Sequence, residues 1–454
     1  MMAGTWHKSP LARTLVVGLG RTGLSCARFL RAQGVPVAVT DSRAVPPGLD
    51  QLRAELPDVA LFLDGFREEV FAVADGLVVS PGVPVAEPLI QAAMARGVPV
   101  VGDIELFALA ARAPVVAITG SNGKSTVTTL VGQMAARAGV RVAVGGNLGE
   151  PALDLLDDRV ELYVLELSSF QLETTYSLRA RAAVVLNLSS DHMDRYPDLA
   201  AYGAAKARIF HGAEIAIINL DDPLVRVMPT GSAERRGFTM GVPDPDAFGL
   251  LDQGGETWLA RGGMPWLRAD ELRIPGRHNQ ANALAALALG QAAGLPREAM
   301  CEALRHFGGL PHRSALVAER AGCRWYDDSK GTNPGATVAA LEGLVPPGSR
   351  HRAVLIAGGD GKGADFGPLA AAIVRTSRAV VLLGRDAPRI AAALNGSLPV
   401  GQAGDMDDAV RQAAAFAQPD DCVLLSPACA SLDMFENYEH RGRVFAEAVR
   451  RLPR

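Results

Sequence analysis

Six consecutive residues near position 120 have the side chains and glycines that a phosphate-binding loop needs. They are Gly120-Ser121-Asn122-Gly123-Lys124-Ser125, between an apolar run at 115–119 and a segment from 125 onward that predicts a helix. Glycines let backbone N–H groups converge on an anion at a helix start, the lysine reaches β- and γ-phosphates, and the serine hydroxyl joins a Mg²⁺ shell. A glycine usually stands six residues before the lysine, where this chain has Ile118, so the loop is a variant. We expect it to bind ATP.

Two further apolar runs end in residues that could hold a metal ion. Glu166 ends the run at 161–166, and Asp191, His192 and Asp194 follow the run at 182–188. Because the carboxyl ends of parallel strands meet at one edge of a sheet, we expect these side chains beside the phosphate loop. Carboxylates there suit Mg²⁺, which prefers oxygen ligands. A lone histidine in such a turn is more often structural, but the Asp-His-Met-Asp cluster favours a functional role.

A second glycine-rich loop occurs near the start of the chain. Residues 18–23, Gly-Leu-Gly-Arg-Thr-Gly, fit G-x-G-x-x-G, and Asp41 ends the next predicted strand, near the acidic position that recognises a ribose. Alone, this pattern is weak evidence for NAD. Its domain of roughly 100 residues is about half of a full dinucleotide fold. We therefore favour a mononucleotide-type ligand, with its diphosphate at the loop and Asp41 or Arg43 near its other end.

The spacing of apolar runs predicts the elements that position these residues. Short Val-, Ile- and Leu-rich runs alternate with Ala-rich helical patterns, which is typical of an α/β fold with parallel sheets covered on both faces. At roughly 150 residues per domain, a chain of 454 residues predicts about three domains. We place them at 1–102, 103–309 and 310–454, and we expect 230–272 to be β-rich and hairpin-like.

Composition and charge argue against several classes of protein. The net charge of −4, without a long basic run, gives no reason to expect a nucleic-acid partner. No apolar run reaches the ~18 residues of a membrane span, and the first residues lack the apolar region of a signal peptide, so we expect a cytoplasmic chain without membrane insertion. The cysteines show no metal-ligand spacing and are expected to be reduced. They are Cys26, Cys301, Cys323, Cys422 and Cys429.

Other short segments complete an ordered set of motifs that runs nearly from end to end. They are "GLGRTGLSC", "DSR", "SPG", "TGSNGKST", "GGNLG", "LELSSFQLE", "LNLSSDHMDRY", "AAKARIF", "GRHNQANALAALAL", "LPHR", "YDDSKGTN", "GGDGKGADF" and "LSPACASLDMFENYEHRG". Together these motifs resemble those of the Mur ligases, the ATP-dependent amide-forming enzymes of peptidoglycan precursor synthesis. Within that family they are most similar to the ligases that add glutamate to UDP-N-acetylmuramoyl-L-alanine.

The resemblance implies a fold and an activity. The expected fold has a Rossmann-like N-terminal domain for the UDP-linked substrate, a central domain with a parallel sheet of the P-loop ATPase type, and a Rossmann-like C-terminal domain for the amino acid. The expected reaction joins D-glutamate to UDP-N-acetylmuramoyl-L-alanine through an acyl phosphate and forms ADP, with ATP and two Mg²⁺ ions as cofactors. A monomer is expected. One glycine loop would then hold the UDP group and the other would hold ATP.

The resemblance also implies roles for individual residues, motif by motif. Residues implied for the UDP-linked substrate are Gly20, Arg21, Thr22, Asp41, Arg43, Gly82, Asn147, Ser168 and Gln171. Residues implied for ATP are Gly120, Ser121, Asn122, Gly123, Lys124, Ser125, Thr126, Asn279, Asn282, Arg313 and Asp328. Implied metal ligands are Ser125, Glu166, His192 and Lys206. Residues implied for glutamate are Lys330, Thr332, Lys362, Ser431, Leu432 and Tyr438. Catalysis is implied for Lys124, His192, Lys206, Arg313, Lys330 and Lys362.

Two of these positions have a second interpretation. Lys206 matches the lysine that such ligases carry as a carbamate, which turns a cation into an anion able to hold Mg²⁺. From the residues alone, a lysine on a helix surface is favoured. Tyr438 stands where the family has a phenylalanine against the glutamate, so the contacts of the added hydroxyl are left open.

Other functions stay open at this point. Another ligase of the same superfamily could add L-glutamate or build folylpolyglutamate, although folylpolyglutamate synthetases lack this N-terminal domain. A nicotinamide-dependent oxidoreductase would use the first glycine loop but would leave the Lys124 loop unexplained. A non-catalytic nucleotide-binding module would not need the predicted metal ligands.

Overall fold

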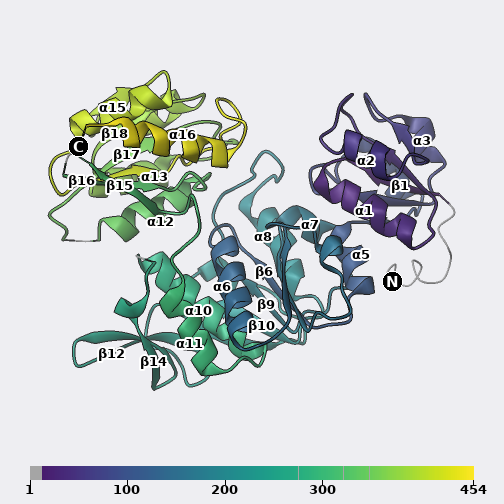
Figure 1. Ribbon diagram of the computed structural model, residues 1–454, viewed down its shortest axis with the longest axis horizontal. Helices are drawn as coiled ribbons and strands as arrows, with labels where there is room; N and C mark the ends of the chain where they lie inside the picture. The colour runs from purple at the N-terminus through teal and green to yellow at the C-terminus, as the bar shows by residue number, and fades with distance from the viewer. Residues whose placement is uncertain (1–12, 275, 321, 347, 454) are drawn as a thin grey trace.

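The fold is built on three sheets that follow one another along the chain. The computed structural model describes residues 13–274, 276–320, 322–346 and 348–453. Figure 1 shows three lobes, with the N-terminal elements on one side, the C-terminal elements on the other and the central elements between them. The predicted α/β class, with a parallel-dominated sheet in each of three lobes, is confirmed.

The N-terminal sheet has five parallel strands in the order β3-β2-β1-β4-β5. Its strands are β1 (Thr14–Val17), β2 (Val37–Thr40), β3 (Ala60–Phe62), β4 (Gly76–Val79) and β5 (Val100–Val101). Its helices are α1 (Arg21–Ala32), α2 (Leu49–Glu55), α3 (Glu68–Ala72) and α4 (Pro88–Ala95). Strand order reverses direction at β1, between β2 and β4, and such switch points form the ligand crevices of open α/β sheets. The first glycine loop follows β1.

The central sheet has nine strands in the order β14-β13-β12-β11-β10-β9-β6-β8-β7. They are β6 (Val115–Thr119), β7 (Val142–Gly146), β8 (Leu162–Glu166), β9 (Ala182–Val185), β10 (Ile215–Asn219), β11 (Glu234–Phe238), β12 (Phe248–Gln253), β13 (Glu256–Arg261) and β14 (Met264–Arg268). The last three form an antiparallel meander within the stretch predicted to be hairpin-like. Strand β6 lies between β8 and β9, so the phosphate loop is flanked by the ends of the two strands that lead to Glu166 and Asp191.

The helices of the central lobe are α5 (Asp103–Ala110), α6 (Lys124–Arg137), α7 (Ser169–Glu173), α8 (Leu199–Ala207), α9 (Pro223–Arg226), α10 (Arg277–Ala292) and α11 (Arg297–His306). Three short 3₁₀ segments join them: η1 (Ala152–Leu155), η2 (Arg208–Phe210) and η3 (Ala269–Glu271). Helix α8 begins where Asp198 accepts the backbone N–H of Ala201, a capping contact that satisfies one of the free donors of the first turn.

The C-terminal sheet has six strands in the order β15-β16-β20-β17-β18-β19, antiparallel only between β15 and β16. Its strands are β15 (Ala315–Arg320), β16 (Cys323–Asp327), β17 (Ala353–Ala357), β18 (Ser377–Leu382), β19 (Val400–Gln402) and β20 (Cys422–Leu425). Its helices are α12 (Pro334–Leu344), α13 (Gly367–Thr376), α14 (Ala387–Leu394), α15 (Met406–Phe416) and α16 (Tyr438–Arg451).

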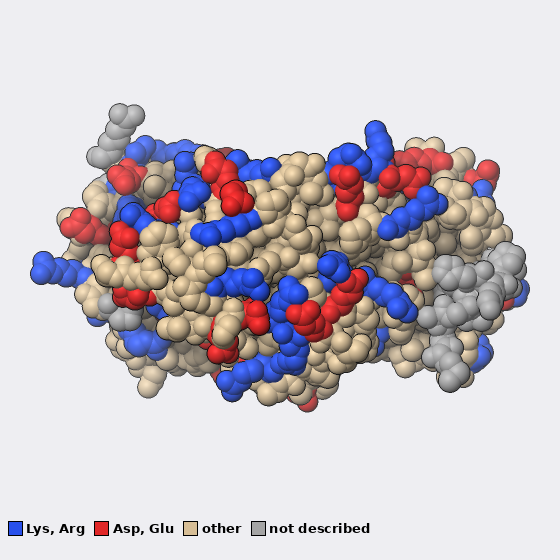
Figure 2. Space-filling view, turned by 90° about the horizontal axis from the view of Figure 1, so that it is seen from below, with Lys and Arg blue, Asp and Glu red and all other residues tan. Residues whose placement is uncertain are grey.

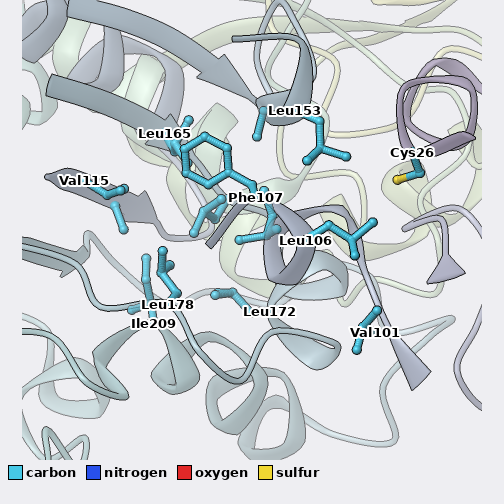
Figure 3. Close-up of a cluster of buried hydrophobic side chains, with 14 of the residues drawn as sticks. Cys26, Val101, Leu106, Phe107, Val115, Leu153, Leu165, Leu172, Leu178 and Ile209 are labelled. Atoms are coloured by element: carbon cyan, nitrogen blue, oxygen red, sulfur yellow. The ribbon is translucent and has the colours of Figure 1, made fainter. Parts of the chain in front are cut away.

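The N-terminal and central sheets share one hydrophobic core. A single cluster of buried side chains includes Val16 and Val78 of the first sheet together with Leu165 and Val185 of the second. Figure 3 shows the seam, where Phe107 of α5 lies among side chains from β6, β8 and η1. By contrast, the two clusters of the C-terminal sheet consist of residues between positions 317 and 452. The boundaries at 102 and 309 stay a prediction.

The surface carries charges of both signs. Figure 2 shows Lys and Arg side chains interspersed with Asp and Glu side chains over one face of the molecule. Among the described residues, no helix is both long enough and apolar enough to cross a bilayer. All five cysteines lie within the described residues, and each is a buried thiol outside any disulfide.

Candidate active site

The phosphate loop has the backbone conformation that its glycines allow. Gly120 and Gly123 have φ of +150° and +85°, and Lys124 begins α6. A Cβ on Gly123 would lie 2.4 Å from the side-chain oxygen of Asn282, so this position accepts only glycine. The Nζ of Lys124 donates to the carbonyl oxygens of Gly120 and Ser121 at 2.8 and 2.9 Å. Burial lowers the pKa of the Lys124 ammonium, against the opposite effect of the Glu166 carboxylate.

A second layer of polar side chains fixes the loop from the end of β9. Asn187 accepts the backbone N–H of Asn122 at 2.8 Å and donates to its carbonyl oxygen at 3.1 Å. The Ser121 hydroxyl exchanges hydrogen bonds with the backbone of Ser189, both at 3.0 Å. Both supporting residues belong to the motif "LNLSSDHMDRY", but the sequence prediction did not include them in the site. The loop is therefore held in shape without a ligand.

Glu166 places a carboxylate directly beside the loop. It is 3% exposed, and its Oε1 accepts a hydrogen bond of 2.7 Å from Asn147. Within the residues that the structure describes, its Oε2 is buried and has no hydrogen-bond partner. Burial has the largest single effect and raises the pKa of this carboxyl, but the charges of Lys124 and Arg313 together with hydrogen bonding outweigh it, so that the pKa is lowered overall. The result is a buried anion with one free oxygen next to the phosphate loop, which suits a cation ligand.

Asp191 and His192 lie at the end of the neighbouring strand. His192 has φ of +58°, a left-handed conformation that is uncommon for a residue other than glycine. Burial lowers the pKa of its imidazole to about 4, although Asp191 acts in the opposite direction, so the ring is neutral at pH 7. Asp191 is paired with the Nζ of Lys362 at 2.8 Å. A neutral imidazole is free to offer a lone pair to a metal ion.

Lys206 is a buried residue, and its interpretation as a surface lysine is wrong. It is 1% exposed, and its Nζ donates to the carbonyl oxygen of Gly120 at 2.9 Å. Lys124 donates to the same oxygen, so two ammonium groups would share one acceptor. Burial and then the charge of Lys124 lower the pKa of Lys206 well below its ordinary value. A neutral amine at this position is a nucleophile, which is the form that adds CO₂.

Side chains of the C-terminal lobe reach across to the phosphate loop. Arg313 donates to the Ser125 hydroxyl at 2.8 Å. Asn333 donates to the Asn122 side chain at 3.0 Å and to Asp191 at 3.2 Å. Together with the Lys362–Asp191 ion pair, these contacts bring the two lobes together through polar groups. Asn333 caps α12 at its start and was not among the predicted site residues.

A first cleft of about 320 Å³ lies between these two lobes. Of the residues predicted for ATP, it is lined by Asn122, Gly123, Thr126, Asn279, Asn282, Arg313 and Asp328. Asp328 accepts hydrogen bonds from the Ser314 backbone N–H at 3.0 Å and the Ser426 hydroxyl at 2.7 Å. Burial raises the pKa of this carboxyl to about 6. The structure thus joins residues of the phosphate loop to Asn279, Asn282 and Asp328, the more distant of the predicted ATP residues, in one space.

A second cleft of about 280 Å³ continues from the phosphate loop. It is lined by the predicted residues Ser121, Asn122, Gly123, Lys124, Ser125, Asn147, Glu166, Ser168, His192, Lys206, Arg313, Lys330, Thr332 and Lys362. Every residue for which the resemblance implies a catalytic or metal-binding role is in this set. Asp191 lines the cleft as well, whereas Asp194, the other predicted carboxylate, does not. The structure brings them together from β8, α8, the phosphate loop and the C-terminal lobe.

A third cleft of about 560 Å³ lies at the first glycine loop. The predicted residues Gly20, Arg21, Thr22, Asp41, Arg43, Gly82, Asn147 and Gln171 line it. Asn147 lines both this cleft and the one at the phosphate loop, so the two spaces meet at its side chain. The cleft at the first glycine loop therefore meets the cleft at the phosphate loop, where the lysines and Arg313 lie.

Asp41 lines the third cleft and also supports the first glycine loop. It is 2% exposed, and its Oδ2 accepts the Leu19 backbone N–H at 2.7 Å. Its two oxygens also hold the guanidinium of Arg43 at 2.8 Å. Asp41 thus braces the glycine loop and orients Arg43, which is the more exposed of the two. A Cβ on Gly20 would meet no atom within 4 Å.

Two predicted substrate residues are tied to each other at the start of α7. Ser168 and Gln171 form a capping box, in which each side chain bonds the other's backbone. The Gln171 amide also donates to Asp103 at 2.8 Å. Burial raises the pKa of the Asp103 carboxyl to about 6. Asp103, absent from the predicted site, is therefore a buried support for a residue that lines the third cleft.

The predicted glutamate residues divide into two groups. Lys330, Thr332 and Lys362 line the cleft at the phosphate loop, whereas Ser431, Leu432 and Tyr438 do not. Leu432 is 74% exposed. The Nζ of Lys330 lies 3.7 Å from the centre of the Tyr438 ring, which connects the two groups by a cation–π contact. Burial lowers the pKa of Lys330 to about 8.

The chain matches three families of known domains in sequence. Residues 12–102 match the Mur ligase MurD-like N-terminal domain, residues 118–290 the Mur ligase middle domain, and residues 312–429 the Mur ligase glutamate ligase domain. The UDP-N-acetylmuramoylalanine--D-glutamate ligase of Nitrosococcus oceani is 57% identical over 442 residues, 97% of each chain. The enzyme of that name from Pseudomonas putida is 57% identical over 96% of each chain.

A solved structure with a related fold agrees with these matches. MurF from Acinetobacter baumannii superimposes with a TM-score of 0.61 over 98% of this chain and 94% of its own, at 16% identity. That identity is low enough to establish similarity of fold alone. The sequence matches go further, because they cover nearly the whole chain at more than half identity. The family predicted from the motifs is thus confirmed, and the chain belongs to the Mur ligases.

Proposed function

We propose that this chain is an ADP-forming ligase that joins D-glutamate to UDP-N-acetylmuramoyl-L-alanine. The observation that carries the proposal is that the clefts at the two glycine loops meet at Asn147, beside a group of buried and partly buried lysines and an arginine. An enzyme that activates a UDP-linked carboxylate with ATP needs both nucleotides to point at one reaction centre. The names of the highly identical relatives support the same substrates.

The reaction needs cations at two stages. In the first, a carboxylate oxygen of the substrate attacks the γ-phosphorus of ATP, which gives an acyl phosphate and releases ADP. In the second, the glutamate amine attacks the acyl carbon, the carbon–oxygen bond to phosphate breaks, and the amine loses its proton. Negative charge grows on phosphate oxygens in the first stage and on the acyl oxygen in the second. We assign Lys124 and Arg313 to the first stage, and Lys330 and Lys362 to the second.

Lys206 is proposed to act as a carbamate. Addition of CO₂ to its neutral amine releases one proton and places an anion beside the Lys124 ammonium. Its burial and its shared acceptor with Lys124 support this, because both disfavour the ammonium form. The two oxygens of the carbamate would face the cleft that Glu166 and His192 also line.

Two Mg²⁺ ions are proposed as cofactors, together with ATP, which the Mur ligase family uses. Among the described residues, no group of three or more His, Cys, Asp and Glu side chains could hold a metal ion by itself. The donors present are nevertheless those that Mg²⁺ accepts: the Ser125 hydroxyl, the free oxygen of Glu166 and a Lys206 carbamate, with His192 nearby. Phosphate oxygens would complete the coordination. The metal would supply charge neutralisation for the transferred phosphoryl group.

The glutamate site is proposed to lie between the cleft at the phosphate loop and α16. Lys330, Thr332 and Lys362 would meet the glutamate near its amine, and Ser431, Leu432 and Tyr438 would meet it at the far end. The contact between Lys330 and the Tyr438 ring supports one continuous site. The same proposal includes a division into domains at residues 102 and 309 and a monomeric state. It also includes a cytoplasmic location, in which the cysteines are reduced.

Product analysis tests the activity directly. The protein is incubated with UDP-N-acetylmuramoyl-L-alanine, ATP, Mg²⁺ and either D- or L-glutamate, and the UDP-linked product is identified by mass and chiral analysis. We expect one ADP per amide bond and product with D-glutamate only. Product with L-glutamate or a folate would favour another ligase of the superfamily. Tight binding of NAD without ligation would favour an oxidoreductase.

A further inference from the structure

Arg441, in the first turn of α16, is a fully buried arginine. It is 2% exposed. Its guanidinium donates to the Ser329 hydroxyl at 3.0 Å and to the Ser329 carbonyl oxygen at 2.8 Å. It also donates twice to the carbonyl oxygen of Cys429, both at 3.1 Å. All three of its nitrogens therefore bond to neutral backbone or hydroxyl oxygens of two loops.

These two loops and the helix start all carry residues predicted to meet glutamate. Ser329 immediately precedes Lys330, and Cys429 lies two residues before Ser431. The Ser329 hydroxyl in turn donates to the carbonyl oxygen of Tyr438 at 2.8 Å, on the same helical turn as Arg441. One guanidinium thus connects the segments that present Lys330, Ser431 and Tyr438. Each segment comes from a different part of the C-terminal lobe.

Burial of this charge is costly, so its placement needs an explanation. A buried ion loses its hydration, and hydrogen bonds to neutral acceptors replace only part of that loss. Burial lowers the pKa of Arg441 to about 10, although the group remains charged at pH 7. A lysine would carry the same charge but could not direct donors to both loops at once, because only the planar guanidinium presents several donors in a fixed fork.

We propose that Arg441 is a positioning residue of the glutamate site, which sets the spacing of the loops that carry Lys330 and Ser431 against the Tyr438 ring. The inference rests on the proposed ligase function. Arg441 touches no substrate itself, since it is enclosed by protein, and it acts through the loops that it joins. Its loss should therefore weaken the recognition of glutamate while leaving the ATP-dependent activation of the other substrate largely intact.

The test uses Arg441→Lys with Arg443→Lys as its matched control. Arg443 is exposed on the same helix, so the control makes the same exchange outside the buried contacts. Steady-state ligation is measured with each of the three substrates varied. Acyl phosphate formed without glutamate is trapped by hydroxylamine, and the unfolding midpoint is recorded for each variant. Arg441→Met gives a second variant that removes the charge.

We expect Arg441→Lys to raise the KM for D-glutamate about 10- to 100-fold, as the loss of one or two hydrogen bonds of the charged fork would. The KM values for ATP and the UDP-linked substrate should stay within about threefold of the parent, and trapped acyl phosphate should form at the parental rate. Arg443→Lys should leave all of these values unchanged.

Two results would overturn the inference. One is an unchanged KM for glutamate in Arg441→Lys. The other is an equal loss in both half-reactions that follows the unfolding midpoint, which would indicate a general structural role. Failure of the parent protein to ligate D-glutamate would instead refute the proposed function, so the two failures can be told apart.

Discussion

Asn333 offers a sharp test of how the C-terminal lobe reaches the phosphate loop. Its side chain does two things at once. Its oxygen accepts the Ala336 backbone N–H at 2.9 Å and so caps α12, while its amide nitrogen donates to Asn122 and Asp191 in the central lobe. Serine is an equally good helix cap but is too short to reach across. Asn333→Ser therefore removes the cross-lobe contacts and keeps the cap.

The size of the effect follows from the two donated bonds. A hydrogen bond between neutral groups contributes about 1 kcal/mol, and one to a carboxylate such as Asp191 contributes about 1.5–3 kcal/mol. The sum is about 2.5–4 kcal/mol, or roughly 70- to 900-fold, if the contacts form only in the closed, reactive arrangement. The Lys362–Asp191 ion pair persists in the variant. We therefore expect the lower end, about 70-fold, in kcat/KM.

Asn333→Asp makes the prediction more specific. Aspartate caps a helix as well as asparagine, but its second oxygen would stand where the amide nitrogen lies, 3.2 Å from the Asp191 carboxylate. At that distance two negative charges repel by about 5 kcal/mol at an effective dielectric constant of 20. Lys362 offsets part of this. Asn333→Asp should thus lose more activity than Asn333→Ser despite the same heavy-atom shape.

The assay is ligation at saturating ATP, with unfolding midpoints measured in parallel. The matched control is Asn437→Ser, which exchanges another helix cap of the same lobe, at the start of α16, where the residue is exposed. Small-angle scattering with bound ATP reports how far the lobes close. Parental kcat/KM in Asn333→Ser, or an equal loss in Asn333→Ser and Asn437→Ser, would refute the reasoning.

Four further expectations follow from the other parts of the site. Lys124→Ala should abolish ligation, since its charge beside the β- and γ-phosphates has no substitute in the loop; turnover near the parental rate would contradict the ATP assignment. Lys206→Ala should be nearly inactive and partly restored by acetate, which replaces the missing anion, and full activity without acetate would show that no carbamate is needed. Gly20→Val and Arg43→Ala should weaken binding of the UDP-linked substrate in calorimetric titrations and leave ATP binding nearly unchanged, because a side chain on Gly20 points into open space of the third cleft. Equal losses of affinity for both ligands would contradict this division between the two loops. The pKa of the Asp103 carboxyl is about 6 in the folded protein against 3.8 ordinarily, so the folded state binds the carboxyl proton more tightly than the unfolded state does. The free energy of unfolding should therefore fall by about 3 kcal/mol as pH rises from about 4 to about 6. Asp103→Asn should remove that decline in denaturant titrations, and an unchanged dependence of the unfolding free energy on pH would rule out this buried carboxyl as its source.

The parts of the site that could be predicted from the sequence are those in which spacing along the chain fixes position. A strand, a glycine turn and a helix start are local, so the phosphate loop and the first glycine loop follow from order alone. Glu166 and His192 were predicted beside the loop because the ends of parallel strands meet at one edge. The strand order confirms the reason, since β6 lies between the two strands concerned.

The rest depends on contacts between segments far apart in the chain. Lys206 looks like a surface residue because lysine is rarely buried, and only the packing of α8 against the phosphate loop shows otherwise. Asn333 and Arg441 stand in the motifs "YDDSKGTN" and "LSPACASLDMFENYEHRG". Their individual roles nevertheless carry no signal in a single sequence, since an asparagine before a proline and an arginine in a helix are both common. Asp41 matches a ribose motif, but its partners are a loop amide and Arg43.

The three lobes are joined by different kinds of contact, and this difference affects how they can move relative to one another. The apolar seam around Phe107 joins the first two sheets into one body. In the described part of the chain, the third lobe shares no buried apolar cluster with them; α12 lies against α10, and hydrogen bonds and an ion pair that water can replace reach the phosphate loop. The molecule then has one hinge, between the C-terminal lobe and the other two, and closing this hinge removes a single set of rigid-body motions. A chain with two free joints would have to lose two such sets of motions before its three substrates could meet, and the entropic cost of each turnover would be correspondingly larger.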